Sequence, residues 1–269
     1  MELKEIEELS KEIRREVLTM VYQSKSGHLG CSLGIVDILI TLYFTILNID
    51  PKKPSLETRD RFLLSKGHAV SALYAVLAKR GFFSESLLLD YLKDGSKLAG
   101  HVTLDSLPGI EATAGSLGHG LSIGIGMALA IKHNNLPSKV YILIGDGECA
   151  EGSIWEGINF AGHHKINNLI LLLDNNNLQI MGHGTDILNS LPFEEKFKSF
   201  GWDVKTIDGH NFSELSEAFQ QQVLNKPLAI IANTIKGKGI LFMENKVEWH
   251  GVAPKPDECT RAIEEIKRS

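Results

Sequence analysis

Two apolar runs that each end in polar residues constrain the fold of this chain more than any other feature. The first, Val140–Ile144, is followed by Gly-Asp-Gly-Glu (145–148), and the second, Leu169–Leu173, is followed by Asp-Asn-Asn-Asn (174–177). Apolar residues in the intervening segment 153–161 recur at helical spacing. The pattern predicts a strand-helix-strand crossover between two buried parallel strands.

Both polar runs are expected at the same edge of the sheet. Ligands of open parallel sheets bind outside the carboxyl ends of the strands. Asp146 and Asn176 offer the oxygen ligands that Mg²⁺ prefers, and Gly147 lets the backbone approach a phosphate. Either run alone is ordinary turn composition. Their separation fits one crossover unit, so the pair predicts a site for Mg²⁺ and a diphosphate.

Strand and helix patterns alternate along the rest of the chain. They predict a single α/β domain over residues 1–269, with three α/β/α layers around a mainly parallel central sheet. We expect the charged tail, residues 254–269, to leave the sheet, where a partner could meet it. Further strands are predicted at 61–65, 202–207 and 228–234, and helices at 2–25, 35–47, 84–92, 213–224 and from residue 115 onward.

Composition and charge argue against several classes of function. The chain has 269 residues, is 43% hydrophobic and 23% charged, and carries a net charge of −5 with both signs interspersed. It therefore offers no basic footprint for nucleic acid or an anionic membrane, and neither is expected as a partner. The N-terminus does not resemble a signal peptide, and no apolar run approaches the roughly 18 residues of a membrane span. Three scattered cysteines fit neither a disulfide framework nor a zinc site, which favours a cytoplasmic location.

Four histidines stand out by their settings. His28, His68, His101 and His250 each lie beside a glycine at the end of a predicted element, where a side chain can face a ligand. Taken singly, each is explained more simply as a structural histidine. None has metal-ligand spacing to a second histidine or to a cysteine, so zinc is not indicated.

Two glutamates and a glycine-rich run complete the candidates. Glu151 precedes the crossover helix, where an acid suits the helix dipole. Glu156 lies deeper in that apolar helix, where a buried carboxylate would need a partner. The glycines of 115–124 match the dinucleotide fingerprint only weakly, and close helix packing explains them more simply.

Together these motifs resemble one family, the thiamine diphosphate-binding N-terminal half of transketolase. The matches occur in order over nearly the whole chain, which makes chance agreement implausible. They are Ser24-Lys25-Ser26-Gly27-His28, Ser65-Lys66-Gly67-His68-Ala69, Gly100-His101, Pro108-Gly109-Ile110, Gly115–Gly120, Gly145–Glu148, Glu151-Gly152, Trp155-Glu156, Asp174–Gly182, Asp208-Gly209-His210, Lys236–Gly239 and Trp249-His250-Gly251.

The resemblance implies the thiamine diphosphate-binding fold and a role for each candidate. It places Mg²⁺, with Ca²⁺ or Mn²⁺ as substitutes, on Asp146, Asn176 and the carbonyl of Leu178, and it places the diphosphate near Gly147. It implies that the backbone of Gly115 and Leu117 contacts the pyrimidine ring, and that Lys236 lies near the diphosphate. His68 and His250 would lie near the diphosphate and the reacting centre, while His28 and His101 would bond substrate hydroxyls and assist proton transfer. Glu151 and Glu156 would lie at a subunit interface.

The chain length and two residue differences depart from the family pattern. The chain stops where the second, pyrimidine-binding domain of transketolase would start, and that domain supplies the glutamate that protonates the aminopyrimidine. Leu29 stands where proline is common, and His119 where glutamine is common, so the role of His119 is left open.

The resemblance therefore implies an N-terminal subunit that is active only with a C-terminal subunit, as an α2β2 heterotetramer. The implied reaction transfers a two-carbon ketol unit from a ketose phosphate to an aldose phosphate, as in the pentose phosphate pathway.

Two alternatives remain open from the sequence. A different thiamine diphosphate activity, such as deoxyxylulose phosphate synthase or the α chain of a 2-oxo acid dehydrogenase, would use the same fold, although His101 and His250 favour ketol chemistry. A non-catalytic, cofactor-binding regulatory subunit is disfavoured because Asp146, Asn176 and the four histidines are all present.

Overall fold

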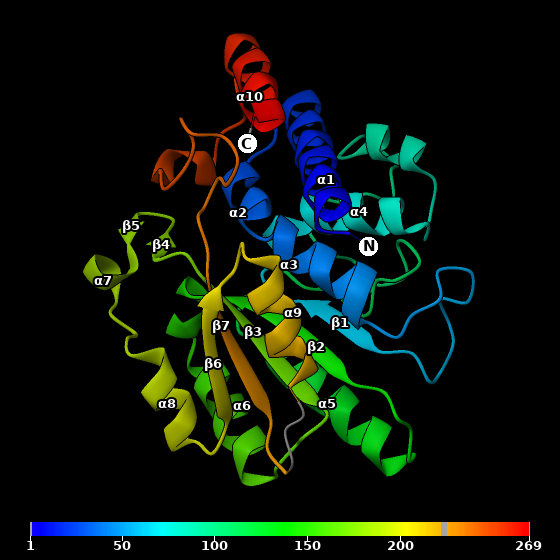
Figure 1. The fold of residues 1–269 in the computed structure, drawn as a ribbon, viewed down its shortest axis with the longest axis vertical. Helices are drawn as coiled ribbons and strands as arrows, with labels where there is room; N and C mark the ends of the chain where they lie inside the picture. The colour runs from blue at the N-terminus through cyan, green and yellow to red at the C-terminus, as the bar shows by residue number, and fades with distance from the viewer. Residues whose placement is uncertain (1, 222–224, 269) are drawn as a thin grey trace.

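A five-stranded parallel sheet forms the centre of the molecule (Figure 1). The computed structural model describes residues 2–221 and 225–268. The strands lie in the order β1-β2-β3-β7-β6, and each neighbouring pair is parallel. Their bounds are β1 (Arg61–Leu64), β2 (Val140–Gly145), β3 (Leu169–Asn175), β6 (Asp203–Asp208) and β7 (Leu228–Asn233). The predicted crossover is confirmed, with α6 (Gly152–His163) joining β2 to β3.

Helices cover both faces of the sheet, which confirms the three-layer architecture (Figure 1). Successive strand residues point into different cores: Phe62 and Leu64 of β1 enter one, and Leu63 enters the other. Because both faces are covered, β2, β3 and β7 are almost continuously apolar, whereas the edge strand β6 is largely polar. The first core is shared with α1 (Leu3–Ser24), α2 (Leu29–Gly34), α3 (Val36–Thr41), α4 (Val70–Arg80), α9 (Phe212–Gln220) and α10 (Pro256–Arg268), and the second with α5 (Gly120–His133), α6 and α8 (Phe193–Ser199).

The helix predicted at 35–47 differs from the structure. It starts earlier, as α2, is interrupted at Ile35, and continues as α3 and a π-helical turn at Leu42–Ile46. Every residue from 29 to 43 is buried, so the segment has no polar face to mark its start or its break. For the helix predicted at 213–224, α9 accounts for the part up to Gln220, and residues 222–224 lie outside the described residues.

Two other helix predictions need correction. The segment predicted as a helix at 84–92 forms a 3-10 helix at Glu85–Asp90, in which only Leu88 is buried, so little packing supports a longer helix. The glycine-rich helix starts at Gly120 rather than 115, because residues 115–119 form a loop. The remaining short elements are β4 (Leu178–Gln179), β5 (Gly182–His183), α7 (Gly184–Ile187) and 3-10 turns at Gly67–Ala69, Gly147–Ala150 and Val247–His250.

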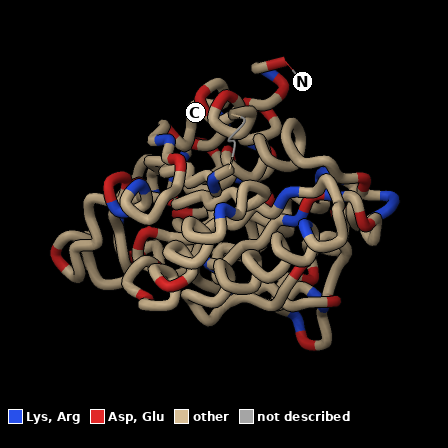
Figure 2. The backbone as a smooth tube through the Cα atoms, turned by 90° about the horizontal axis from the view of Figure 1, so that it is seen from below, with Lys and Arg blue, Asp and Glu red and all other residues tan. Residues whose placement is uncertain are grey.

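The C-terminal helix α10 lies outside the sheet and packs beside α1 (Figure 1). Its buried face carries Cys259, Ala262 and Ile266. Lys and Arg are mixed with Asp and Glu along the chain, as Figure 2 shows from below. Among the described residues no helix combines the length and apolarity that crossing a bilayer requires.

Candidate active site

Three adjacent strands end level with one another at one edge of the sheet. Gly145 of β2 is opposite Asp174 of β3, and Asn175 of β3 is opposite Asn233 of β7. A cavity of about 470 Å³ opens there. The residues predicted to meet the cofactor, the metal or the substrate all line it: His28, His68, His101, Gly115, Leu117, Asp146, Gly147, Asn176, Leu178, Lys236 and His250.

Asp146 is a buried carboxylate that no cationic side chain contacts directly in the part of the chain that the structure describes. It is 8% exposed and accepts hydrogen bonds from the backbone N–H groups of Gly147, at 2.8 Å, and Asn177. Burial, with the nearby Asp174 carboxylate, raises its pKa to about 6. Because a buried charge is costly without compensation, this side chain is suited to an external cation.

Asn176 and Leu178 lie across the cavity edge from Asp146. Asn176 donates to Asp174 Oδ2 at 3.0 Å and accepts from Leu178 N–H at 3.1 Å, which orients its amide. Gly147 lines the cavity, and a Cβ there would lie 3.2 Å from Gln179 Cγ, so any larger residue would have to displace the Gln179 side chain. An oxygen donor set beside an uncovered backbone fits a hard divalent cation with a diphosphate.

A lysine–aspartate pair lies beneath this surface, and neither residue was assigned a role from the sequence. Lys66 donates to Asp174, and their side chains are 4% and 1% exposed. Asp174 also accepts from the hydroxyl of Thr234, at the end of β7. The pair thus joins the ends of β1, β3 and β7. The only sequence signal for it was a lysine and an aspartate placed directly after predicted buried strands.

Glu148 is a second residue whose role the sequence did not reveal. Its carboxylate accepts from Ser65 Oγ, from Gly118 N–H at 2.8 Å and from Gly145 N–H at 3.2 Å. Burial raises the pKa of Glu148. It therefore braces the loop before α5 against the end of β2. That loop brings Gly115 into contact with His101, since a Cβ at Gly115 would lie 2.9 Å from His101 Cδ2.

The four histidines, which are far apart in sequence, form one cluster. The ring of His28 is 5.1 Å from that of His68, 5.9 Å from that of His101 and 5.3 Å from that of His250, between centroids. His28 begins α2 with a left-handed φ of 68°, and its N–H donates to the carbonyl of His250 at 2.7 Å. Non-glycine residues in this conformation often mark functional sites.

Three of these histidines are held neutral. Burial, with Lys66 next, lowers the pKa of His68 to about 2, and burial, with Lys236 next, lowers that of His250 to about 3. Burial and His101 lower the pKa of His28. Neutral imidazoles can both donate and accept hydrogen bonds at neutral pH.

A soft-metal site is a competing interpretation of part of this cluster. Ligand atoms of Cys31, His68 and His250 lie within 4.8 Å of one another. However, Lys236 Nζ is 3.0 Å from His250 Nδ1, and an ammonium can only donate, so this nitrogen is already used as an acceptor. Burial also raises the pKa of the Cys31 thiol. A lysine at its centre and a protonated thiol suit an anion better than a soft cation.

The predicted interface residues lie away from the cavity. Glu151 and Glu156 are both exposed, at the start and on the outer side of α6. The expectation that Glu156 is buried within this chain is wrong, because the apolar side chains of α6 pack on the opposite side, through Ile154 and Ile158. His119 is also exposed, just before α5, and does not line the cavity.

Comparison with known proteins agrees with this geometry. Residues 6–267 match the family described as "Transketolase, thiamine diphosphate binding domain". The chain is 38% identical over 268 residues to one of the subunits of an apulose-4-phosphate transketolase from Phocaeicola vulgatus, covering 99% of this chain and 95% of that one. It is 42% identical over 258 residues to "6-deoxy-6-sulfo-D-fructose transketolase subunit SqwG" of Clostridium sp., covering 95% and 94%.

Solved structures show the same relationship. Transketolase from Campylobacter jejuni superposes with a TM-score of 0.93 at 32% identity, covering 99% of this chain and 43% of that one. Transketolase from Leishmania mexicana gives 0.92 at 27% identity, covering 97% and 41%. The chain thus spans about two fifths of the length of these solved transketolases.

Fold and site together define a thiamine diphosphate-binding α/β domain. More particularly, the chain belongs to the transketolase family and corresponds to the N-terminal half of split transketolase-like enzymes.

Proposed function

We propose that this chain is the N-terminal subunit of a transketolase that depends on thiamine diphosphate and Mg²⁺. With a C-terminal partner subunit it transfers a two-carbon ketol unit from a ketose phosphate to an aldose phosphate. The observation that carries the proposal is one cavity in which the unneutralised Asp146 and the neutral His28, His68 and His250 meet. Thiamine diphosphate, when bound, supplies the electron sink for this chemistry.

The metal and the diphosphate are assigned to the ends of β2 and β3. Asp146, Asn176 and the carbonyl of Leu178 would hold Mg²⁺, or Ca²⁺ or Mn²⁺ in its place, because all three offer oxygen donors at the cavity edge. Gly147 would present its backbone to the diphosphate. Lys236 would add the positive charge that such an anion requires.

The histidines are assigned to the substrate side of the cavity. His28 and His101 would hydrogen-bond sugar hydroxyls and move protons, while His68 and His250 would lie near the diphosphate and the reacting centre. Low pKa values make His68 and His250 hydrogen-bonding groups rather than cations at neutral pH. Gly115 and Leu117 would meet the pyrimidine ring through their backbone.

A partner subunit is proposed from the rim of the cavity and from the relatives' names. Ile180, Met181 and Ile187 line the cavity, yet they are 64%, 83% and 49% exposed, so the rim carries apolar side chains that a second chain could cover. Relatives that this chain covers almost completely are named as subunits. The proposed partner carries the pyrimidine-binding domain.

A second contact would join two copies of this chain and complete an α2β2 heterotetramer. Ile123 and Leu129 of α5 and Phe160 of α6 are exposed apolar side chains on neighbouring helices, and Glu156 is exposed on α6 as well. We assign Glu151 and Glu156 to this interface. Residues 1–269 would act in it as one diphosphate-binding domain.

The substrate class is proposed as sugar phosphates or related anionic sugars. The relatives are named for apulose 4-phosphate and for 6-deoxy-6-sulfo-D-fructose, so the proposal does not commit to a particular sugar pair or to the pentose phosphate pathway. A cytoplasmic location follows from the substrate class and the reduced cysteines, and neither nucleic acid nor a membrane is a proposed partner.

Reconstitution tests the proposal. The purified chain is mixed with thiamine diphosphate, Mg²⁺ and a panel of ketose and aldose phosphates, with and without a candidate C-terminal subunit that carries the pyrimidine-binding domain. Ketol transfer is expected only when both chains are present. Full turnover by this chain alone would refute the two-subunit proposal, and no turnover by the pair on any ketose phosphate would refute the reaction class.

A further inference from the structure

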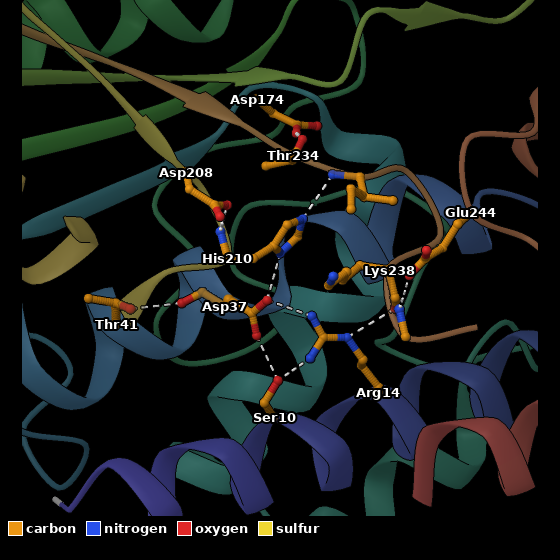
Figure 3. A network of polar contacts seen from close by, with 12 residues as sticks. Ser10, Arg14, Asp37, Thr41, Asp174, Asp208, His210, Thr234, Lys238 and Glu244 are labelled. Carbon is orange, nitrogen blue, oxygen red and sulfur yellow. Dashed lines mark hydrogen bonds and ion pairs between the residues drawn. The ribbon is translucent and has the colours of Figure 1, made fainter. Parts of the chain in front are cut away.

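The Asp208-Gly209-His210 motif matched the transketolase pattern but has no place in the cofactor cavity. His210 follows β6 and does not line the cavity. Its ring instead lies between α3 and the segment that follows β7, as Figure 3 shows. Its side chain is 9% exposed. A buried imidazole with two specific partners raises the question of what it holds in place.

The hydrogen bonds of His210 define its tautomer. Ile235 N–H can only donate, so Nε2 of His210, 2.8 Å away, is the acceptor. Nδ1 therefore carries the proton and donates to Asp37 Oδ2 at 2.7 Å. The ring is fixed at both nitrogens, in the manner of a histidine that a carboxylate orients.

Asp37 in turn is fixed by α1. Arg14 donates to its Oδ2 at 2.6 Å, and Ser10 Oγ donates to its Oδ1 at 2.6 Å (Figure 3). Burial alone would raise the pKa of Asp37, but Arg14 and the hydrogen bond from His210 hold it well below its usual range. The carboxylate is therefore an ionised, stationary anchor for the imidazole.

The segment that His210 holds carries one residue that lines the cavity, Lys236. Immediately before Ile235, Thr234 donates to the buried Asp174, and immediately after it, Lys236 lies 3.0 Å from His250 Nδ1. The bond to His210 thus attaches the backbone between a side chain bonded to the strand ends and a side chain that lines the cavity. A Cβ at Gly34 would lie 3.1 Å from the carbonyl of Ile235, so α2 also presses against this segment.

We propose that Asp37 and His210 are positioning residues that hold Thr234–Lys236 so that Lys236 reaches the diphosphate end of the cofactor cavity. The identity of the ligand rests on the proposed function. The attachment of Ile235 to His210 rests on the hydrogen bonds alone. The two residues touch neither substrate nor cofactor. They act through Ile235, and Lys236 is the group whose position they set.

Two substitutions at His210 separate this role from packing alone. In His210→Gln the side-chain carbonyl reaches roughly the place of Nε2 and can still accept from Ile235 N–H. In His210→Phe a ring of similar size fills the space, but Ile235 N–H loses its acceptor. Ser10→Ala is a graded control: it removes one hydrogen bond from Asp37 and one acceptor from Arg14, but it leaves Arg14 and His210 bonded to Asp37 Oδ2.

The measurements are amide hydrogen exchange and cofactor affinity, made on the complex with its partner subunit. We expect His210→Phe to speed exchange in residues 234–238 and to weaken binding of thiamine diphosphate in Mg²⁺ by roughly tenfold, as for other second-layer partners of a site. His210→Gln should recover most of both, and Ser10→Ala, which keeps both ring nitrogens of His210 paired, should change both less than His210→Phe does. kcat at saturating cofactor should fall less than the affinity.

A further variant covers the case in which His210→Phe does not fold. In Asp37→Asn the amide oxygen would keep the place of Oδ2, because both Arg14 and His210 donate there, but the acceptor is then neutral and weaker. Exchange in 234–238 should rise and cofactor binding should weaken, both by less than in His210→Phe.

Unchanged exchange and unchanged affinity in His210→Phe, or in a folded Asp37→Asn variant, would overturn the inference. Equal losses in His210→Phe and His210→Gln would also overturn it, because packing would then explain both. If the wild-type complex binds no thiamine diphosphate, the proposed function fails instead. The exchange result still decides whether His210 holds the segment.

Discussion

Two carboxylates lie at the ends of neighbouring strands and differ in whether a cationic side chain contacts them. Asp174, at the end of β3, accepts from Lys66, Thr234 and Asn176, and it is 1% exposed. Asp146, directly after β2, is 8% exposed and accepts only from backbone N–H groups among the contacts described for it. The charge of Asp174 is balanced inside the chain, and the charge of Asp146 is left for a ligand. Similar residues one strand apart thus divide into a structural and a binding role.

Replacing Asp174 with asparagine is expected to have the largest effect. It leaves the ammonium of Lys66 buried without its partner, and removing one member of a buried ion pair costs about 3–5 kcal/mol. Urea denaturation should report this loss in the free energy of unfolding. The double variant Asp174→Asn with Lys66→Met should recover part of it. A wild-type unfolding free energy in Asp174→Asn would mean that the pair does not hold the strand ends together.

Replacing Asp146 with asparagine should leave stability intact and weaken cofactor binding. Its carboxylate lacks a cationic partner among the described residues, so the free energy of unfolding should stay at the wild-type value or rise slightly. Affinity for thiamine diphosphate in Mg²⁺ should fall by roughly 100-fold or more, beyond the effect typical of a second-layer residue. Isothermal titration calorimetry measures both the metal and the cofactor dependence. The metal assignment is refuted if the variant binds as tightly as the wild type.

The pH dependence of cofactor binding sharpens the same contrast. The pKa of Asp146 is raised from 3.8 to about 6, so in the free chain its carboxylate takes up a proton as pH falls through 6. The proton competes with the metal, and Mg²⁺-dependent affinity should weaken toward the limit of about tenfold per pH unit that one proton allows. The stability of the free chain changes in the opposite direction: its free energy of unfolding should rise as pH falls through 6, because protonation removes the uncompensated charge of Asp146. The Asp146→Asn variant should lose this pH dependence, and an equally steep profile in that variant would contradict the prediction.

A smaller effect is expected from the neutral histidines. Their reference pKa is 6.5, whereas burial lowers the pKa of His68 to about 2 and that of His250 to about 3. As pH falls below 6.5 the unfolded chain gains protons that the folded chain does not, so the thermal midpoint should fall. The rings are only partly buried, which limits the size of the drop. His68→Gln should show a shallower fall, and an identical pH profile in that variant would rule out His68 as a source.

Strands β1, β2, β3 and β7 could be predicted well because each contains a short apolar run bounded by polar residues or glycine, whereas β6 is largely polar and is marked mainly by its β-branched residues. Prediction was less successful with α2, α3 and the 3-10 segment at Glu85–Asp90, where burial on all sides or a lack of packing removes the helical period. Every residue proposed from the sequence for cofactor or metal contact lines one cavity, although the individual roles remain predictions.

The α/β class, the crossover that aligns Asp146 with Asn176, and the family could all be read from the chain before folding, because they depend on local period, spacing and ordered motifs. The distribution of charge at the strand ends could not. Lys66 and Asp174 are 108 positions apart, and Asp37 and His210 are 173 apart. No local pattern encodes such pairings. They form only when strands and helices pack and exclude water, because a buried charge is then costly unless an opposite charge lies next to it. In the folded chain Asp174 is therefore paired with Lys66 and joins the strand ends, whereas Asp146 has no cationic side chain in contact among the described residues and can bind a cation.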